Sequence, residues 1–319
     1  MIKVASYQET GKKEIDSIQK VDMKSRNVIW IDGENPSIEE RNSIAKTLDM
    51  DMDYIIDYLD EEEHARVEVE DDYISIIYTV PFIEGTEMET SSFGLFIKQN
   101  VVMSIHKTGL KALDTFEKNF DKTKNGFRKK LITNRYFFIY SMLDTINKDY
   151  LKTLNQIDDR IEELNAEIFK NPRDDHIQEI LRHKKTLVYF SRALLANKEV
   201  LMLVKRGYLP NMSEDDIDNF DDLYSDVLQL IDMTSTYKEL INNSMNLYHS
   251  SISNVMNVTM KKLTVLAVIF VVPTLISGIY GMNFSWMPFI SDPFGFYYSL
   301  FIMVLLIAGL VIYVRRNDL

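Results

Sequence analysis

The chain has 319 residues, a formal net charge of −12 and an isoelectric point near 5.0. This length predicts two structural units and a sizeable core. The acidity argues against nucleic-acid binding, which needs a basic surface, but it is compatible with a cation as partner. Because the chain has no cysteine, disulfides, thiolate metal sites and cysteine nucleophiles are excluded.

Residues 1–126 are typical of a mixed α/β domain, and their N-terminus lacks the apolar core of a secretory signal. The run NVIWID at 27–32 predicts a short strand, and Ser37 is placed to cap a helix after it. The apolar pattern of residues 66–80 predicts strand structure. The segment FGLFIKQNVVMSIH at 93–106 predicts a hairpin that turns at 98–100.

From residue 127 the apolar spacing becomes helical. One series steps by four and three residues: Tyr150, Leu154, Ile157, Ile161, Leu164 and Ile168. A second series recurs every seven residues: Ile180, Leu187, Leu194 and Leu201. Since Asn171 and Pro172 interrupt the helix between them, residues 127–210 are predicted to form an antiparallel helical hairpin.

A very long helix is predicted next, because residues 211–272 contain neither proline nor glycine. Ser213 and Asp216 resemble a capping box at its start, with Asp in place of the usual Glu. At 1.5 Å per residue this interval would extend for about 93 Å. It would comprise a stalk, residues 211–262, that continues into the first of two apolar segments.

Between Leu263 and Val314 the chain has no Lys, Arg or Glu, and Asp292 is the only charged residue. Two transmembrane helices are predicted, at 263–283 and 296–314, because each apolar run is close to the length that spans a bilayer. A buried helical hairpin of a soluble protein is the alternative, but neither run has a polar face. An external loop, 284–295, and a tail, 315–319, complete the chain.

Positive residues flank the two spans and are absent from the loop between them. Lys261 and Lys262 precede the first span, and Arg315 and Arg316 follow the second. The positive-inside rule therefore predicts a multi-pass protein of the cell (inner or plasma) membrane with both termini in the cytoplasm. Most of the protein would be cytoplasmic.

The first span ends in SGIYGMNF at 277–284, with two glycines and an asparagine that a plain membrane anchor does not need. With YGMNF closing the first of two terminal spans, after a long helix and an α/β domain, the chain resembles the CorA family of magnesium transporters. The family signature is Gly-Met-Asn at this place. The resemblance covers the whole layout and implies a homopentameric funnel: an α/β cytoplasmic N-terminal domain, long α-helices and two C-terminal transmembrane helices in membrane lipid.

The resemblance further implies that the first span lines a central pore and the second faces lipid. Gly281, Met282 and Asn283 would form its outer mouth, where amide oxygens meet Mg²⁺ in its water shell. This suits an ion that gives up water reluctantly. Thr274 and Gly278 lie on one helix face and could add hydroxyl and carbonyl rings, although small residues also serve helix packing in membranes.

An apolar gate is expected further along the same face, where side chains recur every three or four residues: Val271, Ala267, Leu263 and Met260. Rings of Val271, Leu263 and Met260 would form a constriction that closes by dewetting. Met260 and Leu263 are equally compatible with a coiled-coil core, and in a bundle of five helices the two interpretations merge.

Regulation in the family is attributed to Mg²⁺ bound between the cytoplasmic domains of neighbouring subunits. Asp222 matches one acid of that site, and its partner is expected in the α/β domain, where Glu84, Glu87 and Glu89 are candidates. Mg²⁺ would thus be both cargo and regulator, with Asn283, Asp222 and Glu84 as its contacts. No organic cofactor is implied.

The sequence departs from the family in the loop, where Phe289 stands at a position that is acidic in many relatives. An enzyme is disfavoured, since no Walker A, G-x-S-x-G or H-E-x-x-H motif occurs. His176 and His183 share a helix face but make a weak metal pair. A zinc or cobalt/nickel transporter of the same superfamily and a non-transporting membrane scaffold stay open as alternatives; Met282 argues against zinc, and Asn283 against the scaffold.

Overall fold

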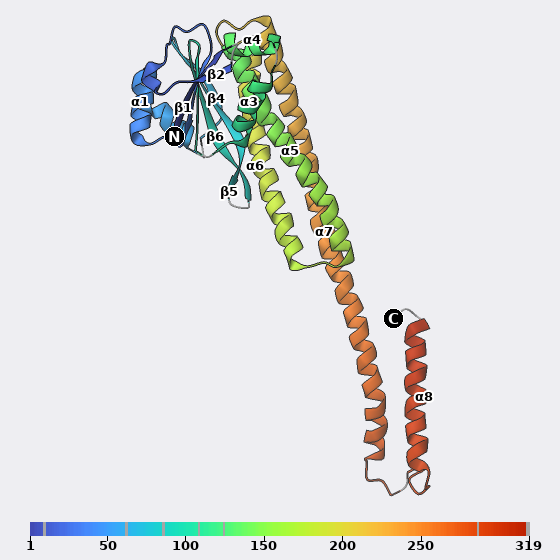
Figure 1. The fold of residues 1–319 in the computed structure, drawn as a ribbon. Helices are drawn as coiled ribbons and strands as arrows, with labels where there is room; N and C mark the ends of the chain where they lie inside the picture. The colour runs from blue at the N-terminus through green and yellow to red at the C-terminus, as the bar shows by residue number, and fades with distance from the viewer. Residues whose placement is uncertain are drawn as a thin grey trace. The chain divides into compact units, whose positions relative to one another are not determined.

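The structure, a computed structural model, describes residues 1–8, 11–60, 63–84, 87–107, 109–123, 125–285 and 287–316, except the side chains of residues 83, 84, 87, 121, 125, 314 and 315. It divides into two compact units (Figure 1). The first comprises residues 1–167 and 173–245, and the second residues 168–172 and 246–319.

A seven-stranded sheet organises the first unit, in the order β2-β1-β3-β7-β6-β5-β4. Its strands are β1 (Ile2–Gln8), β2 (Gly11–Glu14), β3 (Ile29–Glu34), β4 (Arg66–Val69), β5 (Ile74–Glu84), β6 (Glu87–Lys98) and β7 (Val101–His106). The β3–β7 pair is parallel and the other pairs are antiparallel. The predicted hairpin is confirmed, with β6 and β7 joined at Gln99 and Asn100.

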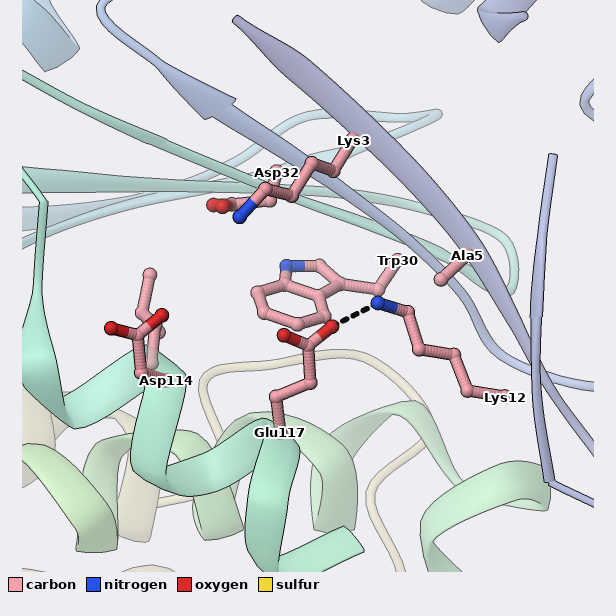
Figure 2. A pocket seen from close by; sticks show the side chains of 8 residues that line it. Lys3, Ala5, Lys12, Trp30, Asp32, Asp114 and Glu117 are labelled. Atoms are coloured by element: carbon pink, nitrogen blue, oxygen red, sulfur yellow. Dashed lines mark hydrogen bonds and ion pairs between the residues drawn. The ribbon is translucent and has the colours of Figure 1, made fainter. Parts of the chain in front are cut away.

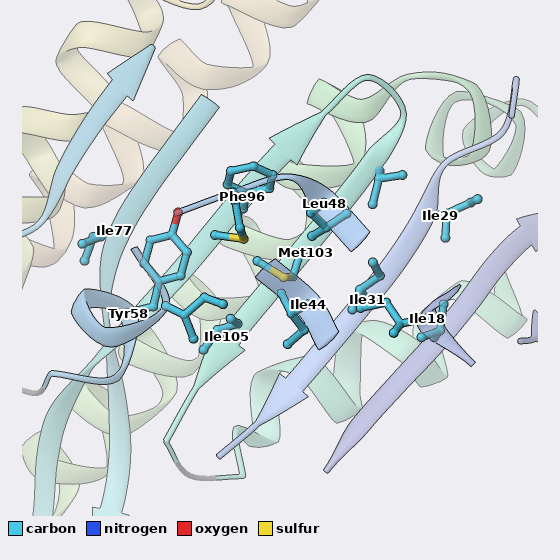
Figure 3. Packing of buried hydrophobic residues seen from close by; sticks show 14 residues of the cluster. Ile18, Ile29, Ile31, Ile44, Leu48, Tyr58, Ile77, Phe96, Met103 and Ile105 are labelled. Atoms are coloured by element: carbon cyan, nitrogen blue, oxygen red, sulfur yellow. The ribbon is translucent and has the colours of Figure 1, made fainter. Parts of the chain in front are cut away.

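One face of the sheet is covered by α1 (Ile38–Leu48) and α2 (Met52–Leu59), beside a short 3-10 helix, η1 (Ile18–Lys20). Figure 3 shows Ile44 and Leu48 of α1 against Ile31 and Met103, which are register partners in β3 and β7. The predicted cap is present, because Ser37 and Glu40 form a reciprocal capping box. The α/β character of this region is therefore as predicted.

The opposite face packs aromatic rings against helices. Tyr7 of β1 and Trp30 of β3 lie within ring-contact distance of Phe138, and Phe116 and Phe120 join the same cluster. The last two residues belong to α3 (Lys111–Lys122), which is followed by α4 (Asn125–Thr133). Helical structure thus begins before residue 127, because an apolar stripe with three- and four-residue spacing is available to cover the sheet.

The predicted helical hairpin is formed by α5 (Arg135–Lys170) and α6 (Asp174–Lys205), with the break at Asn171 and Pro172. Its two predicted apolar series are buried: Tyr150, Leu154, Ile157, Ile161, Leu164, Ile168, Ile180, Leu187, Leu194 and Leu201. The long helix is confirmed as α7 (Glu214–Tyr280), 67 residues in one element. Ser213 Oγ accepts from the backbone N–H of Asp216, and the Asp216 carboxylate accepts from the backbone N–H of Ser213, which forms the expected capping box.

The sheet is bound to the helices at Thr79 of β5. The buried amide of Asn197 on α6 accepts from the Thr79 N–H at 2.8 Å and donates to its carbonyl at 2.8 Å. Tyr150 of α5 donates a second bond to that carbonyl, at 3.1 Å. Next to it, Tyr78 donates to the Oδ1 of Asn147 on α5. Side chains of both helices thus pair with this strand as a neighbouring strand would.

The second unit contains the C-terminal part of α7 and α8 (Gly295–Arg316). Among the described residues, two helices have stretches long and apolar enough to cross a membrane, each with a mean hydropathy of 2.3. The stretch in α7 has none of its residues buried within the chain, and that in α8 only 6%. Apolar helices that stay uncovered need lipid or further protein around them.

Gly94 of β6 offers a test of the packing under α2. A β-carbon at this position would lie 2.0 Å from Cγ of Tyr58, a ring that is fully buried and bound to Ser75. Gly94→Ala should therefore destabilise the first unit by about 1–3 kcal/mol, as overpacked cores do. Thermal unfolding followed by circular dichroism should show a lower midpoint.

Gly126→Ala is the matched control, because no atom lies within 4 Å of a β-carbon at that helical position. Its midpoint should be unchanged or slightly higher, since alanine favours helix over glycine. Equal midpoints for Gly94→Ala and the parent protein would contradict the packing of Tyr58 against this strand.

Candidate ion pathway

The end of α7 explains the glycine at position 281. The Gly281 N–H donates to the carbonyl of Ser277 at 2.8 Å, and that of Met282 donates to Ile279 at 3.2 Å. A β-carbon on Gly281 would approach the Ser277 carbonyl to 3.1 Å, so a side chain there would crowd the last turn. The chain leaves the helix at this point and carries Asn283 beyond it.

Asn283 is exposed, and within the described part of the chain its amide makes no hydrogen bond. An amide that the fold does not use is free to contact a ligand or water. Met282 beside it is also exposed, at 52%. The structure thus places the three signature residues together at the end of a membrane-length helix, with their polar atoms available.

Gly278 and Thr274 precede this end by one and two turns. Thr274 donates its hydroxyl to the carbonyl of Phe270 at 2.8 Å, which leaves the lone pairs of Oγ1 facing away from the helix backbone. A β-carbon on Gly278 would have no atom of the chain within 4 Å. Packing within the chain therefore does not require glycine at position 278. The two interpretations of this glycine, pore lining and close helix packing, both involve a second copy of the chain.

The predicted gate residues are apolar and exposed along α7. Val271 is 60% exposed, and Leu263 and Met260 are each 56% exposed. Ala267 between them is exposed too. Apolar side chains in this state are stabilised when identical helices gather around a common axis or when lipid surrounds them.

The loop between the two spans is fixed by a close contact. Phe289 has a left-handed backbone with φ of 65°, and its ring lies 5.6 Å from that of Tyr298. A β-carbon on Gly295 would come within 2.0 Å of the Phe289 carbonyl, so this fold requires glycine. Asp292 accepts from the amide of Phe294 at 2.8 Å. The one loop carboxylate is thus part of a turn.

Asp222 lies on the exposed face of α7 near two other carboxylates, Asp226 on the same helix and Asp144 on α5. Partial desolvation, followed by repulsion from Asp144 and Asp222, raises the pKa of Asp226. The positive charge of Lys148, which also pairs with Asp144 at 2.5 Å, acts in the opposite direction and lowers the pKa of Asp226. The cluster thus holds more negative charge than its neighbours neutralise.

Sequence reasoning missed Asp144 and Asp226. Asp226 could have been found from its four-residue spacing to Asp222, which puts both on one helix face. Asp144 could not have been found from the sequence, because its position near Asp226 depends on how α5 packs against α7. Within the described residues, no group of three or more His, Asp or Glu side chains is arranged to hold a metal ion by itself.

Of the three predicted partners of Asp222 in the α/β domain, only Glu89 has a described side chain. The side chains of Glu84 and Glu87 lie outside the described structure. Glu89 is bound to Lys185 of α6 at 2.8 Å. His176 and His183, the weak metal pair, lie instead 3.3 Å from Glu167 and 3.6 Å from Glu179 respectively.

Asp32 lines a small cavity beside the sheet (Figure 2) and belongs to a buried polar group with the residue types of a serine-based enzymatic site. Asp32 accepts from the hydroxyl of Ser104 at 2.6 Å and lies 3.1 Å from Nε2 of His106. Ser104 thus points at the carboxylate, whereas a nucleophilic serine needs the histidine as its base. The cavity beside it, which the Lys12–Glu117 ion pair borders, has a volume of about 20 Å³, room for a single water.

Comparison with known proteins decides the family. The family model for CorA-like Mg²⁺ transporter proteins matches residues 25–316. The cobalt/magnesium transport protein CorA of Methanocaldococcus jannaschii is 36% identical over 319 residues, covering 99% of each protein. The chain belongs to the CorA family. This confirms the predicted resemblance and places this CorA chain among transporters and not among enzymes.

Solved structures agree with the fold of this CorA chain. The complete structure of the CorA magnesium transporter from Methanocaldococcus jannaschii has a TM-score of 0.82 and 34% identity, covering 99% of this chain and 98% of that one. The cytoplasmic domain of ZntB from Vibrio parahaemolyticus, at 10% identity and a TM-score of 0.62, covers 79% of this chain and 98% of that domain. The second match shows the fold alone.

The acidic cluster of this CorA chain yields a prediction about pH. Because the pKa of Asp226 is raised in the folded protein, its ionisation favours the unfolded state. This loss of folding free energy is absent below the ordinary carboxylate pKa of about 4, where Asp226 is protonated in both states. It is complete above the raised pKa of the folded protein, where Asp226 is ionised in both states. Asp226→Asn should therefore raise the thermal midpoint in EDTA at about pH 7 and have little effect at about pH 4.

Asp232→Asn, an exposed carboxylate later on the same helix, is the control and should leave the midpoint unchanged. A midpoint for Asp226→Asn at or below that of the parent protein at neutral pH would contradict the raised pKa of Asp226.

Proposed function

We propose that the protein is a channel that carries Mg²⁺ across the cell membrane. The observation that carries this proposal is the exposed, unbound amide of Asn283 at the end of a membrane-length helix. The family membership and the names of the relatives, which are cobalt/magnesium and magnesium transport proteins, support it. Mg²⁺ would be the cargo, and the chain's own amide and carbonyl oxygens its contacts.

The chemistry of the mouth suits a hydrated ion. A ring of Asn283 oxygens, one from each subunit of a homopentamer, would accept hydrogen bonds from the water shell of Mg²⁺ without removing it. Carboxylates in their place would hold the ion more strongly and slow its release. Thr274 hydroxyls and Gly278 carbonyls would continue these contacts inward. At 100 mV, the membrane potential favours entry by about 4.6 kcal/mol for a divalent ion.

The same five-helix arrangement would bring the apolar residues together. Rings of Val271, Leu263 and Met260 would narrow the pore on its inner side, where a dry constriction excludes a hydrated ion. In this arrangement residues 1–126, 127–210 and 211–262 are cytoplasmic, 263–283 line the pore, 284–295 form the external loop and 296–314 face lipid. The tail, 315–319, is cytoplasmic.

Cobalt is a second candidate cargo, because the Methanocaldococcus jannaschii relative is named a cobalt/magnesium transport protein. Amide oxygens that contact the water shell and not the metal can distinguish ions only by the size and charge of the hydrate. These differ little between hydrated Mg²⁺ and hydrated Co²⁺. The mouth alone therefore does not separate them.

We infer further that intracellular Mg²⁺ closes the channel at Asp222. The repulsion among Asp222, Asp226 and Asp144 is the physical basis, since a divalent cation between such carboxylates and a neighbouring subunit would neutralise it. Mg²⁺ would then bind the closed state more tightly and shift the population toward it. When Mg²⁺ is scarce, repulsion would loosen the cytoplasmic domains.

Asn283→Ala tests the mouth. Removal of the amide should abolish Mg²⁺ uptake into liposomes that contain a Mg²⁺-sensitive dye, because the hydrate loses its contacts at the entrance. Expression and assembly should stay as in the parent protein, as measured by size-exclusion chromatography. Ser299→Ala on α8 is the control and should transport normally. Full transport by Asn283→Ala would refute the proposed mouth.

Asp222→Lys tests the sensor. A fixed positive charge in place of the ion should hold the closed arrangement without Mg²⁺. The cytoplasmic domain of this variant should resist proteolysis in EDTA, where the parent protein becomes susceptible. Asp232→Lys adds the same charge on another face of α7 and should be cut like the parent. If Asp222→Lys and the parent are cut equally fast with and without Mg²⁺, the sensor does not include Asp222.

A further inference from the structure

One stretch of α7 is polar but almost free of charge. Between Glu239 and Lys261 the sequence contains no Asp, Glu, Lys or Arg, and its polar residues are chiefly Asn and Ser. His249 is the one residue of this stretch with an imidazole side chain, a group that can be neutral or protonated. It is exposed, and its ring lies 5.9 Å from that of Tyr248.

His249 shares a helix face with the proposed pore residues. It lies 11 residues before Met260 and 29 before Gly278 on one continuous helix. At about 100° per residue, each separation returns the side chain to within about 20° of the same direction. Ser253 and Met256 fall on this face between His249 and Met260, with alternating steps of four and three residues.

We propose that five His249 side chains line the cytoplasmic extension of the pore and set its charge. This rests on the proposed channel function and adds a residue to it. While the imidazoles are neutral, a hydrated divalent cation passes a polar, uncharged wall. Each proton bound adds a positive charge to the ring, which repels Mg²⁺ at close range in a narrow, water-filled passage.

The surroundings of His249 offer little to offset such a charge. Along α7 the nearest charged residues are Glu239 and Lys261, about three turns away on either side. The segment 168–172, which belongs to the same compact unit, contributes Lys170 as its one charged residue. Tyr248 is the neighbouring titratable side chain on α7, and in the proposed ring the His249 side chains of the other subunits would be the next.

The absence of cysteine from the chain permits a direct test of this geometry. In full-length protein, His249→Cys should form disulfide-linked dimers on mild oxidation, because equivalent residues around a narrow axis lie close together. A trimethylammonium-bearing methanethiosulfonate should then lower Mg²⁺ flux by about tenfold or more, since it adds a fixed positive charge to each site. Ser251→Cys, about 200° away on the helix, should show neither effect.

Titration of the ring is tested by Mg²⁺ flux into liposomes at two values of internal pH. Flux through the parent protein should fall by about tenfold from about pH 7.5 to about pH 5.5, whereas His249→Gln should change less than about twofold. His64→Gln, an exposed histidine in the first unit, should keep the parent's dependence. His249→Lys should conduct poorly at both values.

The outcomes separate this inference from the channel proposal. If the parent protein carries no Mg²⁺, the proposed function is wrong, and the cross-linking result alone then decides whether His249 faces the axis. If the parent conducts and Asn283→Ala does not, but His249→Gln keeps the full pH dependence or His249→Cys resists cross-linking, the inference about His249 is overturned while the channel stands.

Discussion

The C-terminal unit leaves its apolar surface uncovered, and the rest of the architecture follows from this constraint. The membrane-length stretch of α7 has no buried residue within the chain, and that of α8 has few. Both must be covered by lipid or by other copies of the chain. Lipid can cover the largely apolar α8, but Thr274 and the uncharged polar stretch before Met260 are better placed against water or another polar wall. This dual character of α7 supports the proposal that it lines a passage.

The first unit contains the acidic cluster that we propose as the sensor of the ion. Asp226 of α7 is repelled by Asp222 on the same helix and by Asp144 on α5. Because Asp222 and Asp226 lie on the helix that also contains Met260 and Gly278, a cation bound there would act on the helix that is proposed to line the pore. The proposed sensor and the proposed apolar constriction are thus parts of one continuous helix.

Much of the helical architecture and the family could be predicted from the sequence, because both depend on local sequence patterns. Seven-residue spacing identified the hairpin of α5 and α6, and the lack of proline and glycine identified α7. The Gly-Met-Asn signature, together with its position at the end of the first of two terminal apolar segments, was enough to identify the family. Features that depend on packing between distant segments were not accessible. The approach of Asp144 to Asp226, the early start of helix at α3 and the requirement for Gly94 beneath Tyr58 arise only in the folded chain.

The sheet and the helices are joined through the backbone of Thr79, and this decides which substitutions the joint can tolerate. Asn197 and Tyr150 bind the N–H and carbonyl of this residue, not its side chain. Any residue other than proline keeps those backbone groups, so position 79 can vary while the bonds persist. Aspartate at 197 would lose the donor, and phenylalanine at 150 would lose the hydroxyl. Substitutions of the helix residues that make these bonds would therefore weaken the joint between sheet and helices, whereas most substitutions at position 79 would keep it.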